Sequence, residues 1–128
     1  MAWMPIELWK TEPEEHDFPA AADYLTLLAP EEAVTAVVEA LRSAPTVHRK
    51  AKDLLRASRH ALLPPDNPHV RKDLEKIADG KHLSPVLVVC GRAGKDVPLT
   101  IADGYHRICA SHHLDENADV PCRLVAWP

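Results

Sequence analysis

The first half of the chain contains two segments in which apolar residues recur at the spacing of a helix. The longer segment has Val34, Val37, Val38 and Leu41 on one face. Pro30 lies at the expected first helical position and Glu31 and Glu32 follow in the first turn, so we predict a helix from Pro30 to about Arg42. A shorter helix is predicted over residues 20–28.

After Pro45 the pattern predicts a third helix, from Thr46 to Arg59. Its inward face would hold Val47, Ala51, Leu54, Leu55 and Ser58. Its outward face would carry the basic residues Arg49, Lys50, Lys52, Arg56 and Arg59, opposed locally by Asp53. Before these helices, residues 6–9 alternate as a short strand would, but the acidic, proline-bearing segment behind them favours a loop or an arm.

Residues 61–63 are apolar and predict a brief strand. The turn over residues 64–68 then ends in a helix start, where Asp66 or Asn67 can act as the cap. Val70, Leu74, Ile77 and Ala78 share one face of the predicted helix, and Gly80 follows it as a terminating residue.

The remaining sequence predicts three strands and a helix. Residues 84–90 form an unbroken apolar, β-branched run, which is typical of a strand covered on both faces. A second strand over residues 99–101 leads into a helix from about Tyr105 to His113. The last strand, residues 120–126, is predicted at a sheet edge because Pro121 lacks a backbone N–H.

The composition fits one soluble α/β domain. The chain has 128 residues, of which 46% are apolar and 27% charged, so one core suffices and disorder is not expected. No apolar run approaches the roughly 20 residues of a membrane span, and no secretion signal is visible, so we expect a cytoplasmic protein. The odd number of cysteines, Cys90, Cys109 and Cys122, favours reduced thiols.

The formal charge of −4 is unevenly distributed. Residues 1–47 carry nine acidic residues against Lys10 and Arg42, whereas residues 48–128 carry 13 basic and 10 acidic residues. The basic run over residues 49–59 could contact phosphates of a nucleic acid, or it could be a solvated helix face.

The main candidate for chemistry is the stretch from Asp103 to Arg107, where a predicted strand turns on Gly104 into a helix that carries His106 and Arg107 in its first turn. Unpaired amides and the helix dipole attract anions there, and a guanidinium can hold oxygens bidentately. His106 could donate a hydrogen bond or move a proton. Alternatively, Asp103 caps the helix and Arg107 pairs with a surface acid.

The segment from Leu62 to Val125 resembles the ParB/sulfiredoxin-like superfamily. The resembling blocks are Asp66-Asn67-Pro68, the helix through Ile77, Leu83-Ser84-Pro85-Val86-Leu87-Val88-Val89, Asp103-Gly104-Tyr105-His106-Arg107 and Asp119-Val120-Pro121-Cys122-Arg123. The resemblance implies one α/β (α+β) domain with a small mixed sheet and flanking helices, in which residues 61–128 are the core and residues 1–60 are an arm and a helical extension. The extension could cap the sheet or form a homodimer contact.

The resemblance also implies a nucleotide-phosphate site. The Gly-x-His-Arg loop assigns phosphate contacts to Gly104, His106 and Arg107, with Asp103, Tyr105 and Ser84 beside them. A nucleoside triphosphate, CTP or ATP, with Mg²⁺ is the implied ligand, and Asp103 is the nearest carboxylate for the metal. His106 and Arg107 are the catalytic candidates for phosphoryl transfer or hydrolysis.

The chain departs from well-known members of this superfamily. Sulfiredoxins have a reactive cysteine before the His-Arg pair, where this chain has Tyr105, so reduction of cysteine sulfinic acid is not expected. Cys109 reads as a buried small residue. Partition ParB proteins have two adjacent arginines in the loop and a downstream DNA-binding domain, and neither is found up to Pro128.

Three alternatives stay open at this point. The first is a DNA-binding or nuclease-type protein, in which the basic run would track phosphates.

The second alternative is a metal site, because His106, Cys109 and His113 share one helical face. Most zinc sites take their ligands from two separate segments, whereas these three residues share one predicted helix.

The third alternative is a non-catalytic interaction module, in which the acidic segment Glu12–Asp17 recruits a partner protein.

Overall fold

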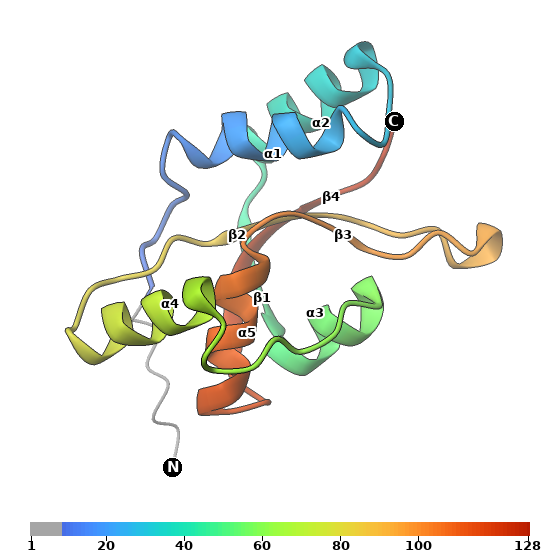
Figure 1. Ribbon diagram of the computed structural model, residues 1–128. Helices are drawn as coiled ribbons and strands as arrows, with labels where there is room; N and C mark the ends of the chain where they lie inside the picture. Colours follow the sequence, from blue (N-terminus) through green and yellow to red (C-terminus); the bar gives the residue numbers. More distant parts are fainter. Residues whose placement is uncertain (1–8) are drawn as a thin grey trace.

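The computed structural model describes residues 9–128 and contains five helices and four strands in these residues (Figure 1). In chain order they are α1 (Asp17–Leu25), α2 (Glu31–Ser43), β1 (Thr46–Lys50), α3 (Ala51–Ser58), α4 (Pro68–Ala78), β2 (Val86–Val89), β3 (Thr100–Asp103), α5 (Tyr105–Leu114) and β4 (Asp119–Val125). A short 3₁₀ turn, Ala93–Lys95, lies between β2 and β3. The predicted fold class, a small α+β domain with a mixed sheet, is confirmed.

The four strands form one sheet in the order β1-β4-β2-β3. β4 pairs with β1 in antiparallel and with β2 in parallel orientation, and β2 pairs with β3 in antiparallel orientation. β2 is buried at every position, as its continuous apolar sequence predicts. β3 therefore lies at one edge of the sheet and β1 at the other.

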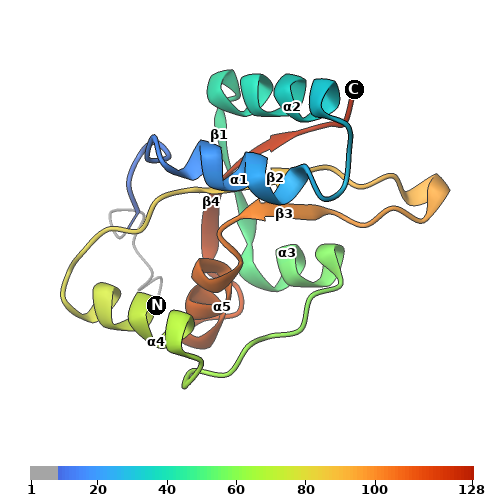
Figure 2. The same cartoon turned by 45° about the horizontal axis from the view of Figure 1, so that its top comes forward.

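Helices cover both faces of the sheet (Figures 1 and 2). On one face, α1 and α2 pack through Phe18, Ala21, Leu25, Val34, Val37 and Leu41 against Leu87, Val89 and Ala102 of the sheet. On the other face, α3, α4 and α5 pack against Val86, Val88 and Ile101. Alternate residues of a strand point to opposite faces, so β2 contributes to both cores.

The prediction of one helix over Thr46–Arg59 is wrong in its first third. Residues 46–50 form β1, which pairs with β4 from Thr46 opposite Arg123 to Lys50 opposite Asp119. The helix begins only at Ala51. The pairing partner lies 69 to 77 residues away in the sequence, so no local pattern predicts the strand. The sheet thus includes a strand from the segment predicted as an extension of the core.

The prediction that the last strand lies at an edge is also wrong, because β4 is central. Pro121 lies opposite His48 of β1, and the pairing of β4 with β2 starts one residue later, at Cys122. The missing N–H therefore lies outside the stretch that β2 pairs with.

Most other predicted elements are confirmed within a few residues. Residues 61–63 are the exception, since they form no strand. Asn67 accepts hydrogen bonds from the amides of His69 and Val70, and Gly80 has a φ of 75° beyond the end of α4, as its position predicts. The alternation at residues 6–9 lies mostly outside the described residues. None of the helices in residues 9–128 combines the length and the apolar character that a membrane crossing requires.

Candidate functional site

The connection from β3 to α5 is a sharp turn on Gly104. Its φ of 111° is a conformation that side chains rarely adopt, and a Cβ atom here would lie 2.4 Å from Cγ1 of Val86 and 2.8 Å from Nη2 of Arg107. Only glycine fits between the central strand and the guanidinium. The turn therefore packs the loop backbone directly against Val86 and Arg107.

The first turn of α5 has no side-chain cap in the described part of the chain. The first backbone hydrogen bond of the helix runs from the N–H of Ile108 to the carbonyl of Gly104, so the amides of residues 105–107 precede the helical hydrogen-bond pattern. One interpretation of the sequence was that Asp103 caps the helix. The structure contradicts it, because no side chain caps α5 in the described residues. The positive end of the helix dipole faces the turn.

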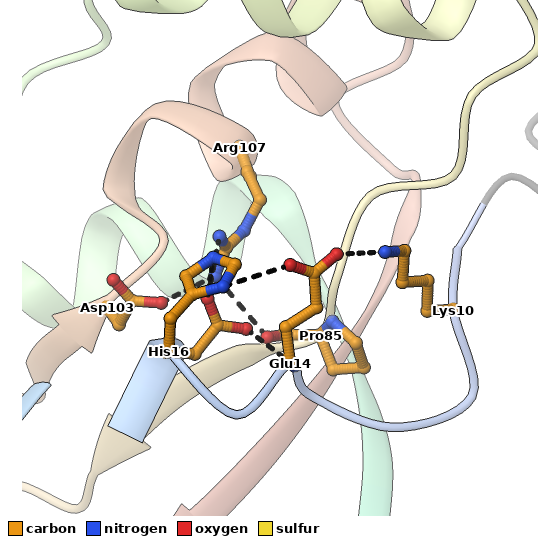
Figure 3. Close-up of polar contacts among 7 residues, drawn as sticks. Lys10, Glu14, His16, Pro85, Asp103 and Arg107 are labelled. Carbon is orange, nitrogen blue, oxygen red and sulfur yellow. Dashed lines mark hydrogen bonds and ion pairs between the residues drawn. The ribbon is translucent and has the colours of Figure 1, made fainter. Parts of the chain in front are cut away.

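The Asp103 carboxylate binds Arg107 instead. Oδ2 of Asp103 accepts a hydrogen bond of 2.9 Å from Nη2 of Arg107, and the same nitrogen lies 3.4 Å from the carbonyl of Pro85 (Figure 3). Nε of Arg107 is buried and has no partner within residues 9–128. Both hydrogen bonds hold the guanidinium through Nη2, and neither of them involves Nη1.

A second carboxylate reaches Arg107 from the N-terminal part of the chain. Asp17, at the start of α1, is 2% exposed, and its Oδ1 lies 3.9 Å from Nη1 of Arg107. Its Oδ2 accepts the N–H of Glu14 at 2.9 Å, and Nε2 of His16 lies 3.4 Å from Oδ1. The sequence placed Asp17 in an acidic segment that could recruit a partner protein. In the structure, Asp17 is buried next to Arg107.

A cavity of about 230 Å³ opens in front of these residues. All but two of its thirteen lining residues have polar side chains, and the exceptions are Leu83 and Gly104. The polar ones are Glu14, His16, His69, Lys72, Asp73, Lys76, His82, Ser84, Asp103, His106 and Arg107. The cavity thus unites residues from the N-terminal segment, from α4 and from the loop before α5.

One wall of the cavity is a polar face of α4 that sequence analysis missed. His69, Lys72, Asp73 and Lys76 recur at three- and four-residue intervals and all line the cavity. The apolar positions of the same helix predicted its buried face. Polar residues at this spacing are equally typical of a solvent-exposed helix face, so the sequence did not indicate a cavity wall. The packing of α4 against α5 turns the stripe toward Arg107.

His106 lies beside His69, with ring centroids 4.7 Å apart. Burial lowers the pKa of His106, and the neighbouring His69 lowers it further. The pKa of a free histidine is about 6.5, so His106 is mainly neutral at pH 7. A neutral imidazole can accept a proton.

The charges of the cavity are balanced. Lys72, Lys76 and Arg107 oppose the carboxyls of Glu14, Asp73 and Asp103. Burial raises the pKa of both Asp73 and Asp103, against the lowering effect of Arg107. A hydrogen bond from Lys10 lowers the pKa of Glu14. The two aspartates therefore take up protons more readily than free aspartates do.

The structure brings most of the predicted site residues together. Asp103, Gly104, His106, Arg107 and the buried Ser84 all line the cavity. Tyr105 does not, because its hydroxyl donates to the carbonyl of Ala61 and its ring packs against His60, 4.7 Å between centroids. Tyr105 lines a neighbouring hollow, which shares Asp103, Gly104 and His106 with the cavity.

The zinc alternative has no support in residues 9–128, which contain no group of three or more His, Cys, Asp or Glu side chains placed to hold a metal ion. Cys109 is fully buried, and burial raises the pKa of its thiol. Nε2 of His113 lies 2.6 Å from the carbonyl of Leu63.

The basic run lies apart from the cavity. Arg49 and Lys50 are on β1, at the opposite edge of the sheet from β3, and Lys52 and Arg56 are exposed on α3. Arg56 pairs with Asp53, and Arg59 pairs with Asp96. A surface that binds through these residues would therefore not include the Gly104 loop.

Comparison of the chain with protein-family models, with curated proteins and with solved structures gave no match. The resemblance to the ParB/sulfiredoxin-like superfamily stays a prediction.

Proposed function

We propose that this cavity binds the phosphate groups of a nucleotide or of another phosphate ester. The observation that carries the proposal is the position of Arg107, whose guanidinium lines the cavity beside the uncapped N-terminus of α5. Backbone amides at a helix start and an arginine fork are two donors that match phosphate oxygens. Lys72 and Lys76 would add positive charge from the opposite wall.

The fixed orientation of Arg107 supports this role. Asp103 and the Pro85 carbonyl hold Nη2, so the guanidinium loses little further freedom when an anion contacts Nη1. The absence of a side chain at Gly104 also lets the Arg107 guanidinium lie close against the loop backbone, since a Cβ there would lie 2.8 Å from Nη2 of Arg107.

A divalent ion could bind in this cavity without being surrounded by protein ligands on all sides. Mg²⁺ commonly binds one or two carboxylates together with phosphate oxygens and waters. Asp73 and Asp103 line the cavity, and of the two, Asp103 is already hydrogen-bonded to Arg107. Asp73 is therefore the better candidate for the metal, in place of the Asp103 suggested by the sequence.

If the site hydrolyses its ligand or transfers a phosphoryl group, it also needs a proton acceptor. A water or hydroxyl that attacks phosphorus must lose a proton as the bond to the leaving group breaks, and the neutral imidazole of His106 could accept that proton. His106→Gln should then keep ligand binding and lose turnover.

Thermal-shift and calorimetric titration with inorganic phosphate, CTP, ATP, GTP and ADP, each with and without Mg²⁺, tests the binding proposal. A ligand at 100 times its dissociation constant should stabilise the fold by about 2.7 kcal/mol. Arg107→Gln should abolish the shift. Arg71→Gln is the matched control, because Arg71 is exposed on α4 and does not line the cavity. If wild-type protein binds none of these ligands, the proposal is wrong.

A further inference from the structure

Two more hollows continue from the phosphate cavity along β3. The first, of about 280 Å³, shares Asp103, Gly104 and His106 with the phosphate cavity. The second, of about 490 Å³, shares Tyr24 and His60 with the first. The three hollows thus follow one another along a single edge of the sheet, where β3 runs between α1 and α3 (Figures 1 and 2).

The chemistry of the lining changes along this line. The phosphate cavity is polar, whereas the far hollow has a mostly apolar wall made of Leu28, Ala29, Val97, Pro98, Leu99 and Trp127. Of the six large apolar side chains exposed in residues 9–128, Tyr24, Leu28 and Val97 line the far hollow. An exposed apolar surface next to a charged cavity is typical of a binding groove.

Rings surround the part of the groove nearest the Gly104 loop. Tyr24 is 39% exposed and lines both hollows, as does His60. Tyr105 packs against His60 and is fixed by its hydrogen bond to Ala61. The groove also runs along residues 101–104, and β3 has a strand partner on one side only, so backbone groups on its other side can bond a ligand.

We propose that this groove binds an aromatic group carried by the same ligand whose phosphate occupies the Arg107 cavity. The inference rests on the proposed function and specifies it, since the ligand is then an aromatic phosphate ester, such as a nucleotide, oriented with its ring toward Tyr24 and His60. The shared residues Asp103, Gly104 and His106 place the groove next to the phosphate cavity. An aromatic ring suits this surface because tyrosine and histidine offer flat faces for stacking.

The experiment compares the affinities of inorganic phosphate, phenyl phosphate and cyclohexyl phosphate by calorimetry. We expect wild-type protein to bind phenyl phosphate about tenfold more tightly than inorganic phosphate, which is a typical gain from one aromatic contact. The cyclohexyl ester should gain less, because its ring has no π face. The indole N–H signal of Trp127, assigned with Trp127→Phe, should shift with cytidine or adenosine monophosphate and not with inorganic phosphate.

Variants of Tyr24 test the groove directly. Tyr24→Ala should remove most of the gain for phenyl phosphate and leave the affinity for inorganic phosphate unchanged, and Tyr24→Phe should restore the gain. Leu114→Ala is the control, because Leu114 is also exposed but lies at the end of α5 and lines none of the three hollows.

The outcomes separate the two proposals. If inorganic phosphate binds and phenyl phosphate binds no better, or if the gain survives in Tyr24→Ala, the groove proposal is overturned and the phosphate site remains. If neither phosphate nor any ester binds, the proposed function itself fails.

Discussion

The Asp17 carboxylate lies 3.9 Å from the Arg107 guanidinium, although 90 residues separate the two in the sequence. Both side chains are largely buried, with 3% and 16% of their surface exposed. Asp17 starts α1 and Arg107 lies in the first turn of α5, so this contact ties the N-terminal segment to the Gly104 loop. The cavity is incomplete without that segment, which also supplies Glu14 and His16.

Loss of the Asp17 carboxylate should destabilise the fold. Asp17→Ala leaves the Glu14 amide without its acceptor and weakens the neutralisation of Arg107, so we expect a loss of about 2 to 3 kcal/mol in urea unfolding. Asp17→Asn keeps an acceptor and should lose less. Asp23→Ala, an exposed position on the same helix, should change stability by less than about 0.5 kcal/mol. Equal effects at both positions would contradict the role of Asp17.

Gly104→Ala should destabilise the protein by about 2 kcal/mol or more. The new Cβ meets Val86 of the fully buried strand β2, and the φ of 111° is strained for alanine. Gly94→Ala is the control, since a Cβ at Gly94 meets no atom within 4 Å. Chemical denaturation measures both, and a Gly104→Ala protein as stable as the control would show that the loop is not as tightly packed as described.

The pH dependence of stability should depend on Asp73. Its pKa is raised by burial, so the folded state binds a proton more tightly than the unfolded state does. Stability from this group is therefore highest below the ordinary carboxyl pKa of about 4 and is lost as pH rises through the raised folded pKa. Asp73→Asn should stabilise the protein at pH 7, and the gain should vanish at pH 3.

Urea unfolding of both proteins across this pH range measures the difference. Asp66→Asn, at an exposed position before α4, should show no such pH-dependent gain. A gain for Asp73→Asn that does not vary with pH would mean that burial of the charge is not its cause.

Replacement of His69 should raise the pKa of His106. The lowered pKa of His106 comes first from burial and then from the charge of His69, and His69→Ala reduces both effects. NMR titration of the imidazole carbons of His106 measures the change. His48→Ala on β1 should leave the His106 titration where it is, and an unchanged pKa in His69→Ala would show that the two rings do not interact.

Local sequence patterns predicted most helices and strands, because the residues that start, end or bury these elements lie within them or beside them. The helix α4 could be predicted from Asn67, Pro68 and Gly80, since caps and terminators act within a few residues. β2 follows from an apolar run that only a doubly covered strand accommodates. The Gly104-His106-Arg107 loop could be predicted in the same way, as a glycine turn between a strand and a helix.

The pairing of the strands and their order in the sheet could not be predicted from local patterns. The sequence 46–50 has a pattern compatible with a helix, and it becomes a strand because β4 offers hydrogen bonds to its backbone. β4 in turn is central despite Pro121, because the proline falls just before its pairing with β2.

For the site, the sequence alone determined the residues of the loop: a glycine that permits a sharp turn between a strand and a helix, and an arginine at the helix start. Only the tertiary structure decided what surrounds that loop, because Asp17, the polar face of α4 and the ring of Tyr24 come from segments that are distant along the chain. Side chains on a helix surface look alike in sequence whether they face water or a cavity, and the packing of one element against another makes the difference.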